Sequence, residues 1–229
     1  MEGPGASQPG APGARRHLHS LSLRRTQEQA MVVGIIGAGS IGQALAGHMV
    51  RAGHEVIVSN SRGPESLAGL VRQLGPRTRA GTRQEAAKAD IVVLSVPWEQ
   101  VPGALADLPP WNGRILIDAT NPVLLPGFRL ADLGGRTSSE VVASLAPGAR
   151  VVKAANTLLA AVLAVDPRQA GGRRVLFMSG NDADAMTEAG RLFGQLGFAT
   201  VDLGPLATGG RLQQFPGGPL ATLNLIKLD

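Results

Sequence analysis

Residues 31–62 read MVVGIIGAGSIGQALAGHMVRAGHEVIVSNSR, and this stretch decides the fold. The apolar run at 31–36 predicts a buried strand, and the apolar spacing over 40–52 is typical of a helix that Gly53 caps at its C-terminus. A second apolar run follows at 55–59. The order strand, helix, strand predicts the first unit of a parallel sheet covered by helices.

A glycine-rich turn joins the first strand to the first helix. It reads Gly37-Ala38-Gly39-Ser40-Ile41-Gly42, which is the pattern G-x-G-x-x-G. In this context the first glycine permits a tight turn, the second lets a pyrophosphate approach the backbone, and the third allows close packing of helix and strand. A glycine-rich turn without a ligand is the structural alternative, but the flanking elements favour a dinucleotide site.

The rest of the chain alternates apolar runs with helical patterns. Strands are expected at 90–96, 114–118, 149–153, 173–179 and 198–202, and helices at 65–74, 83–89, 98–107, 138–146, 157–165, 182–196 and 206–226. Several runs are continuously apolar, as in parallel strands buried on both faces. We therefore expect an α/β fold of the Rossmann type, with a doubly wound, mostly parallel sheet and a C-terminal helical segment at about 205–229, all in a single domain over 31–229.

Composition excludes several classes of protein. The 229 residues include no Cys, which rules out disulfides and sulfur-based metal sites, and we expect no metal. Dispersed basic residues and 3% aromatic content argue against a nucleic-acid partner. No apolar run reaches the roughly 18 residues of a membrane helix, so we expect a cytoplasmic protein without membrane insertion. The sequence leaves open whether the protein forms a homodimer. Residues 1–30 predict a disordered Gly-, Pro- and Arg-rich tail without the apolar core of a secretory signal.

The end of the second strand selects between dinucleotides. An NAD site usually carries Asp or Glu here for the ribose hydroxyl, whereas this chain reads Ser59-Asn60-Ser61-Arg62. The Ser61 hydroxyl and the Arg62 guanidinium suit a 2′-phosphate, so NADP(H) is favoured over NAD(H). The structural alternative is a solvated arginine on a loop.

Side chains that transfer protons are scarce. Tyr is absent, and His48 and His54 belong to the first helix and the start of the second strand, where structural or solvent-facing roles are expected. Among the lysines, only Lys153 lies near the carboxyl end of a strand, either reaching the crevice or salt-bridged or solvated beside the sheet. We expect no catalytic side chain, and a hydride acceptor that handles its own protons as a flavin-like ring does.

Further cofactor contacts are expected where the other strands end. Ligands of open α/β sheets bind outside the carboxyl ends of the strands. Asn121 and Asn156 are able to orient an amide or a ring edge without supplying a proton, or else to cap a loop or helix. The remaining residues expected at this edge are Val96, Pro97 and Gln100.

Taken together, the motifs resemble one family. The segments are GIIGAGSIG, the VSNSR turn, LSVPWEQV, TNP, RTSSEVVASLAPGARVVKAANTL, FMSGNDADA and LGFATVDLGPLATGGRL. This set resembles the NADPH-dependent reductases of the deazaflavin coenzyme F420, over nearly all of 31–215. At Asn156 the chain resembles a broader bacterial branch and the cytosolic domain of six-transmembrane metalloreductases, whereas the founding archaeal members carry histidine there.

The resemblance implies a Rossmann-type domain that holds NADP(H) and stacks its hydride partner, F420 or else FMN or FAD, against the nicotinamide. By position, Ala38, Gly39, Ser40 and Ile41 would bind the pyrophosphate. Ser61 and Arg62 would bind the 2′-phosphate, and Val96, Gln100, Asn121 and Ala160 would line the nicotinamide half. A basic residue often found shortly after the Ser-Arg pair is Ser66 here.

Two other functions stay open from the sequence. A reductase of an imine, ketone or hydroxy acid shares the glycine-rich first half, but such families generally add a large helical domain, and only a short segment follows Asp202 here. A non-catalytic NADP(H) sensor, or a reductase subunit that needs a partner, would also lack acid–base side chains.

Overall fold

The computed structural model describes Met1, Gly3 and residues 30–228. Nearly all of the tail expected over 1–30 lies outside these described residues.

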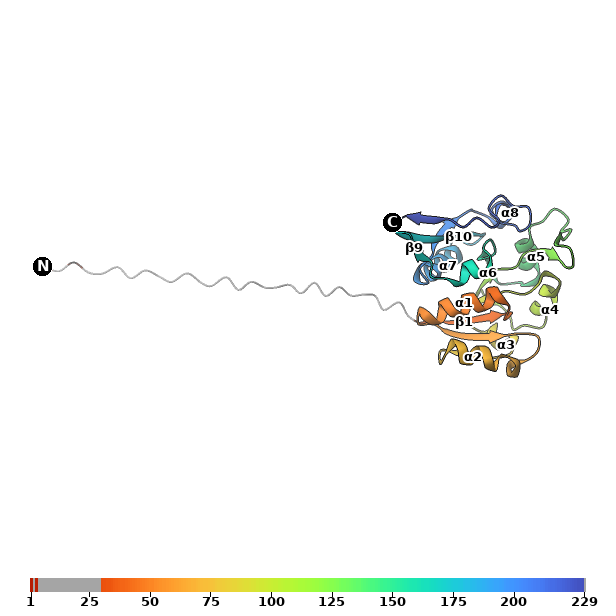
Figure 1. The fold of residues 1–229 in the computed structure, drawn as a ribbon, viewed down its shortest axis with the longest axis horizontal. Coiled ribbons are helices and arrows are strands. Elements are labelled where there is room, and N and C mark those ends of the chain that lie inside the picture. The colour runs from red at the N-terminus through yellow and green to blue at the C-terminus, as the bar shows by residue number, and fades with distance from the viewer. Residues whose placement is uncertain (2, 4–29, 229) are drawn as a thin grey trace.

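One ten-stranded sheet runs through the molecule (Figure 1). Its strands are β1 (Val32–Ile36), β2 (Glu55–Ser59), β3 (Thr78–Ala80), β4 (Ile91–Leu94), β5 (Ile115–Asp118), β8 (Arg150–Ala154), β9 (Arg168–Gln169), β10 (Gly172–Gly180), β11 (Ala199–Asp202) and β12 (Ile226–Leu228). The order is β11-β10-β8-β5-β4-β1-β2-β3, with β9 and β12 paired to β10. Because β1 pairs in parallel with both β2 and β4, the direction of winding reverses at β1, and ligands of such sheets bind at that point.

The expected mostly parallel Rossmann sheet is confirmed, with one change of direction. The strands from β3 across to β8 pair in parallel, but β10 runs antiparallel to β8, and β11 runs parallel to β10. A short hairpin of β6 (Val123–Leu124) and β7 (Arg129–Leu130) forms a separate two-stranded sheet. The sequence pattern did not predict β3, β9, β12 or this hairpin, because segments of two or three residues carry too little periodicity.

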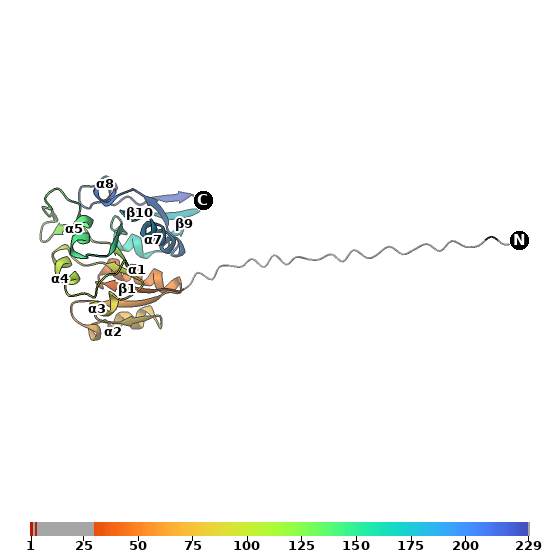
Figure 2. The ribbon, with the colours of Figure 1, turned by 180° about the vertical axis from the view of Figure 1, so that it is seen from behind.

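Helices cover both faces of the sheet (Figures 1 and 2). They are α1 (Ser40–Arg51), η1 (Pro64–Leu67), α2 (Ala68–Leu74), α3 (Arg83–Ala86), η2 (Trp98–Gln100), α4 (Val101–Leu105), α5 (Ser138–Leu145), α6 (Ala160–Ala164), α7 (Ala183–Gln195) and α8 (Leu206–Leu212). One buried cluster joins α1 and α7 to the sheet, and a second contains residues of α3, α4, α5 and α8. Both faces are therefore covered, which explains the continuously apolar strands.

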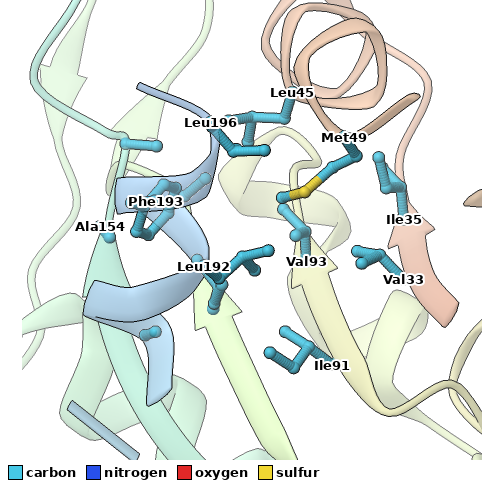
Figure 3. Close-up of a cluster of buried hydrophobic side chains, with 14 of the residues drawn as sticks. Val33, Ile35, Leu45, Met49, Ile91, Val93, Ala154, Leu192, Phe193 and Leu196 are labelled. Carbon is cyan, nitrogen blue, oxygen red and sulfur yellow. The ribbon is translucent and has the colours of Figure 1, made fainter. Parts of the chain in front are cut away.

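The larger cluster is centred between α1 and α7. Leu45 and Met49 of α1 and Leu192 and Phe193 of α7 belong to this cluster above the strands, as Figure 3 shows. All four side chains are fully buried. Burying an aliphatic or aromatic side chain of this size stabilises the fold by about 1.5–3 kcal/mol, so this packing holds α1, and with it the glycine turn at its start, against the sheet.

The C-terminal segment differs from expectation. The helix expected over 206–226 is formed only by α8, and the chain ends in a strand, β12, paired with Gly172–Arg174. The chain cannot continue the helix because two prolines follow, at 216 and 219. It also folds back on the end of α8, where a Cβ on Gly218 would lie 2.5 Å from the carbonyl oxygen of Gln214.

Candidate dinucleotide site

The glycine turn lies at the carboxyl end of β1, between β2 and β4. Gly37 has a φ of 111°, and its N–H donates to the carbonyl of Ser59 at 3.0 Å. A Cβ on Gly37 would lie 2.0 Å from the carbonyl oxygen of Ser95, and one on Gly42 would lie 2.1 Å from the carbonyl oxygen of Gly37. The fold itself therefore requires both of these glycines.

Gly39 is different. Its φ of −75° and ψ of −178° suit any residue, and a Cβ placed there would meet no protein atom within 4 Å. Neither backbone conformation nor packing within the described chain explains a glycine at this position. The open space beside Gly39 is what the second glycine of the motif provides for the close approach of a pyrophosphate.

Helix α1, whose N-cap residue is Gly39, has no side-chain cap. Its first turn contains no acidic residue, whereas side-chain oxygens of Thr82, Thr137 and Asp182 cap α3, α5 and α7. The first backbone N–H groups of a helix have no partner within the helix, and the N-terminus carries partial positive charge. The N–H groups of Ser40 and Ile41 are thus placed to bind an anion.

The loop after β2 is organised by two of its own side chains. The Asn60 Oδ1 accepts a hydrogen bond from the backbone N–H of Arg62 at 3.0 Å, and the Asn60 Nδ2 donates to the Ser66 Oγ at 2.8 Å. The Ser66 hydroxyl donates to the carbonyl of Gly63 at 2.7 Å. Asn60, expected among the cofactor contacts, thus has its side chain engaged in the loop. Ser66 has a structural part that sequence reasoning missed, because it depends on a hydrogen bond across the loop.

Ser61 and Arg62, by contrast, point into solvent. Both are exposed, and neither the Ser61 hydroxyl nor the Arg62 guanidinium has a hydrogen bond or ion pair within residues 30–228. The loop therefore presents a hydroxyl and a guanidinium fork beside the end of β2, a combination that suits a phosphate.

The end of β4 contributes the next residues of the candidate site. Val96 is partly buried and packs on the second cluster, while Pro97 precedes η2, Gln100 is its last residue, and both are exposed. On the other side, Ala160 begins α6 and is partly buried. These positions surround the edge of the sheet without supplying an acid or base.

Asn121 and Asn156 are bonded to each other. The Asn121 Nδ2 donates to the backbone carbonyl of Asn156 at 2.8 Å, and the Asn156 Nδ2 donates to the Asn121 Oδ1 at 2.9 Å. The same two side chains reach the segment after α8, through the carbonyl of Gln213 at 2.7 Å and the N–H of Phe215 at 3.2 Å. The asparagines therefore tie three segments of the chain together.

Some polar atoms of this cluster have no partner among the described residues. They are the Asn156 Oδ1 and both polar atoms of the Gln213 amide. Gln213 is fully buried, and Asn156 is only 5% exposed. Buried polar groups without a partner are costly, so this cluster has unused capacity for a water or a ligand group. The sequence pattern alone did not identify Gln213, because it lies far from the asparagines along the chain.

Lys153 forms a buried ion pair beneath this cluster. Its Nζ lies 3.2 Å from the Asp118 Oδ2, and both side chains are completely buried. The same Nζ donates to the Ser138 Oγ at 3.2 Å and to the carbonyl of Thr120. Burial lowers the pKa of Lys153, while the charge of Asp118 opposes that shift. All three donors of the ammonium are used within the protein, so the salt-bridged alternative is confirmed and no N–H is left for a substrate.

Both core histidines have structural contacts. The Arg51 guanidinium lies 2.8 Å from the His48 Nδ1, and the His48 Nε2 lies 2.7 Å from the carbonyl of Leu163. If Arg51 donates, the Nε2 of a neutral ring carries the proton, in keeping with the burial that lowers the pKa of His48. The Nδ1 of His54 accepts from the N–H of Met31 at 3.3 Å. The expected structural role is confirmed.

The architecture and the site define a class of protein. A doubly wound sheet, an uncapped helix behind a glycine turn, and a phosphate-compatible loop after β2 are the features of a Rossmann-type, NADP-dependent oxidoreductase. Residues 32–122 match the family described as NADP oxidoreductase, coenzyme F420-dependent. Within the described residues, no helix is both long and apolar enough to cross a membrane.

Two solved structures resemble this chain over most of its length. A hypothetical protein from Sinorhizobium meliloti is 47% identical, covers 88% of this chain and 97% of its own, and superposes with a TM-score of 0.82. A protein from Arthrobacter sp. FB24, proposed to be an F420-dependent NADP reductase, is 28% identical over 77% of this chain and 86% of its own, with a TM-score of 0.65.

A curated relative is a larger protein. Metalloreductase STEAP3 of Rattus norvegicus is 30% identical over 196 residues, which make up 85% of this chain and 38% of the metalloreductase. The chain thus spans less than two fifths of the length of the curated metalloreductases that it matches.

Proposed function

We propose that the protein transfers hydride between NADP(H) and the deazaflavin coenzyme F420, or alternatively FMN or FAD, by direct ring-to-ring transfer. The observation that supports NADP(H) binding is the open space at Gly39, because no contact within the described chain explains a glycine at this position. The family description and the proposed role of the Arthrobacter protein support F420 as the partner.

The residues present fit an NADP molecule. The N–H groups at the start of α1 hold the pyrophosphate, and Ser61 and Arg62 hold the 2′-phosphate. Val96, Pro97, Gln100, Asn121, Asn156 and Ala160 surround the nicotinamide half. NADPH bound by these residues would supply a hydride to the acceptor ring, with a proton from water, to give NADP⁺ and the reduced acceptor.

The side chains around the nicotinamide half position the rings and exclude water rather than move protons. Lys153 is fully engaged in its ion pair, and His48 and His54 have structural contacts elsewhere. A ketone or imine acceptor needs a positioned proton donor, whereas ring-to-ring hydride transfer needs mainly orientation. This favours a deazaflavin or flavin over an imine, ketone or hydroxy acid.

The test is a spectroscopic assay of the purified protein with NADPH, offering F420, FMN and FAD in parallel and NADH as the nucleotide control. We expect NADPH-dependent bleaching of F420. A matched pair of variants tests the site: a Cβ meets no protein atom within 4 Å at either Gly39 or Gly69, but only Gly39 adjoins the proposed pyrophosphate. Gly39→Ala should lose NADPH binding and turnover, and Gly69→Ala should keep both.

Two results would overturn the proposal. Unchanged NADPH affinity in Gly39→Ala would exclude the pyrophosphate position. Clear NADPH binding by the unmodified protein, without turnover of any of the three acceptors, would exclude the stand-alone reductase and leave a sensor or a subunit that needs a partner.

A further inference from the structure

The ion pair of Asp118 and Lys153 bonds to Thr120, the residue that precedes Asn121 of the proposed nicotinamide half. The two residues face each other across β5 and β8 in register, and both side chains are completely buried. The start of α5 covers them: Ser138 accepts from the Lys153 ammonium, and the Ser139 hydroxyl donates to the Asp118 Oδ2 at 2.5 Å. The described residues thus shield the pair completely from solvent.

Both members of the pair also bond to Thr120. The Asp118 Oδ1 accepts from the Thr120 N–H at 2.9 Å and from its hydroxyl at 2.7 Å, while the Lys153 ammonium donates to the Thr120 carbonyl. The backbone N–H and the carbonyl of Thr120 are therefore bonded to side chains of opposite charge. Hydrogen bonds to ionised groups are about twice as strong as neutral ones.

The next residue is Asn121, whose side chain bonds to Asn156 and to the N–H of Phe215. A displacement of Thr120 would move Asn121 and, through it, the three segments that meet there. Well-packed apolar side chains are often at least as stabilising as a buried ion pair. Stability alone therefore does not account for two charges at this position.

We propose that Asp118 and Lys153 are positioning residues for hydride transfer, which fix Thr120 so that Asn121 and Asn156 hold the nicotinamide in its reactive orientation. The inference rests on the proposed function and specifies how that site is kept in place. Neither side chain touches the reacting atoms, since every donor of Lys153 is used within the protein.

The test is the double variant Asp118→Asn with Lys153→Met. It removes both charges, avoids an unpaired one, and keeps an amide oxygen that accepts from Thr120. We expect the NADPH Kd to stay within about 3-fold, because the phosphate contacts are distant, and the hydride-transfer rate at saturating NADPH and acceptor to fall about 10- to 100-fold, as misplacement of reacting groups by about 1 Å does.

Two further readouts separate positioning from mere stability. With NADPH deuterated on one face of C4, the double variant should transfer a mixture of hydrogen and deuterium, whereas the unmodified protein should use one face. The N–H groups of Thr120 and Asn121 should exchange faster with solvent. Leu192→Ala, a buried change in α7, serves as the matched control, since it lowers stability by about 2–5 kcal/mol without touching this network.

The outcomes are distinct. A folded double variant with an unchanged rate at saturation and unchanged choice of face would overturn the inference, as would the same losses in Leu192→Ala. If the double variant does not fold, Ser138→Ala with Ser139→Ala loosens the pair while keeping its charges, and a rate that falls less than about 3-fold would overturn the inference. Absence of turnover in the unmodified protein would instead refute the proposed function.

Discussion

The two halves of the candidate site are built in opposite ways. In the open half, around Gly39 and Arg62, the first N–H groups of α1 and the Arg62 guanidinium have no partner in the described chain, and the space beside Gly39 is empty of protein atoms. In the closed half, around Asn121 and Lys153, most polar side chains are bonded to one another. Free donors can be used by a charged ligand, whereas a network bonded mostly within itself holds its shape and leaves only the Asn156 Oδ1 and the Gln213 amide without a partner among the described residues. We infer that the first half supplies affinity for the nucleotide and the second supplies the geometry of the reaction.

The largest expected effect comes from breaking the closed half. Lys153→Met alone leaves Asp118 ionised, buried and unpaired, which should lower the free energy of unfolding by about 3–5 kcal/mol. Urea unfolding followed by circular dichroism measures this loss. Adding Asp118→Asn should recover most of it. A single variant as stable as the unmodified protein would show that the pair carries no charge–charge stabilisation.

The open half should respond through binding rather than stability. In Gly39→Ala the methyl group occupies the space beside α1, so we expect the NADPH Kd to rise about 30-fold or more, corresponding to about 2 kcal/mol. The melting temperature without nucleotide should stay within the range of Gly69→Ala. A fall in melting temperature as large as that of a core variant would mean that the protein itself requires this glycine.

A smaller and more selective effect is expected at the 2′-phosphate. Arg62→Ala should raise the NADPH Kd about 10-fold, because one hydrogen-bonded charge pair is lost, and should leave the weaker NADH binding nearly unchanged. Equilibrium titration of nucleotide fluorescence measures both constants. Arg72→Ala, an exposed arginine of α2, controls for net charge. Equal losses for the two nucleotides would place Arg62 away from the 2′-phosphate.

The smallest effect concerns the cap of α5, which lies over the closed half. The backbone N–H of Thr137 donates to Glu140 and lowers the pKa of its carboxyl group. A carboxylate whose pKa is lowered by folding stabilises the protein above its unfolded pKa, and this contribution is lost as pH falls through the folded pKa. Glu140→Gln should therefore make unfolding free energy fall less steeply as the solution is acidified below about pH 4.5.

The measurement is urea unfolding at a series of acidic pH values, with NADPH binding near neutral pH as the second readout. Nucleotide affinity should not change, because the α5 cap does not touch the open half. An identical pH dependence in Glu140→Gln and the unmodified protein would contradict this account.

The sequence by itself determined the open half. The glycine turn, the strands and helix around it, and the Ser61 and Arg62 pair all lie within residues 31–62, and their structure follows from local backbone preferences and short-range periodicity. The start of α5 is equally local, since Thr137 and Glu140 form a capping box within one helical turn. Resemblance to known motifs extended this to the family.

Only the tertiary structure decided the closed half. Asp118 and Lys153 are 35 residues apart, and so are Asn121 and Asn156, while Gln213 joins them from a segment where a longer helix was expected. Such contacts depend on which strands become neighbours and on where the chain turns back after α8. Local periodicity records which residues are buried, but the choice of partner for a buried polar group is made only when distant strands pair.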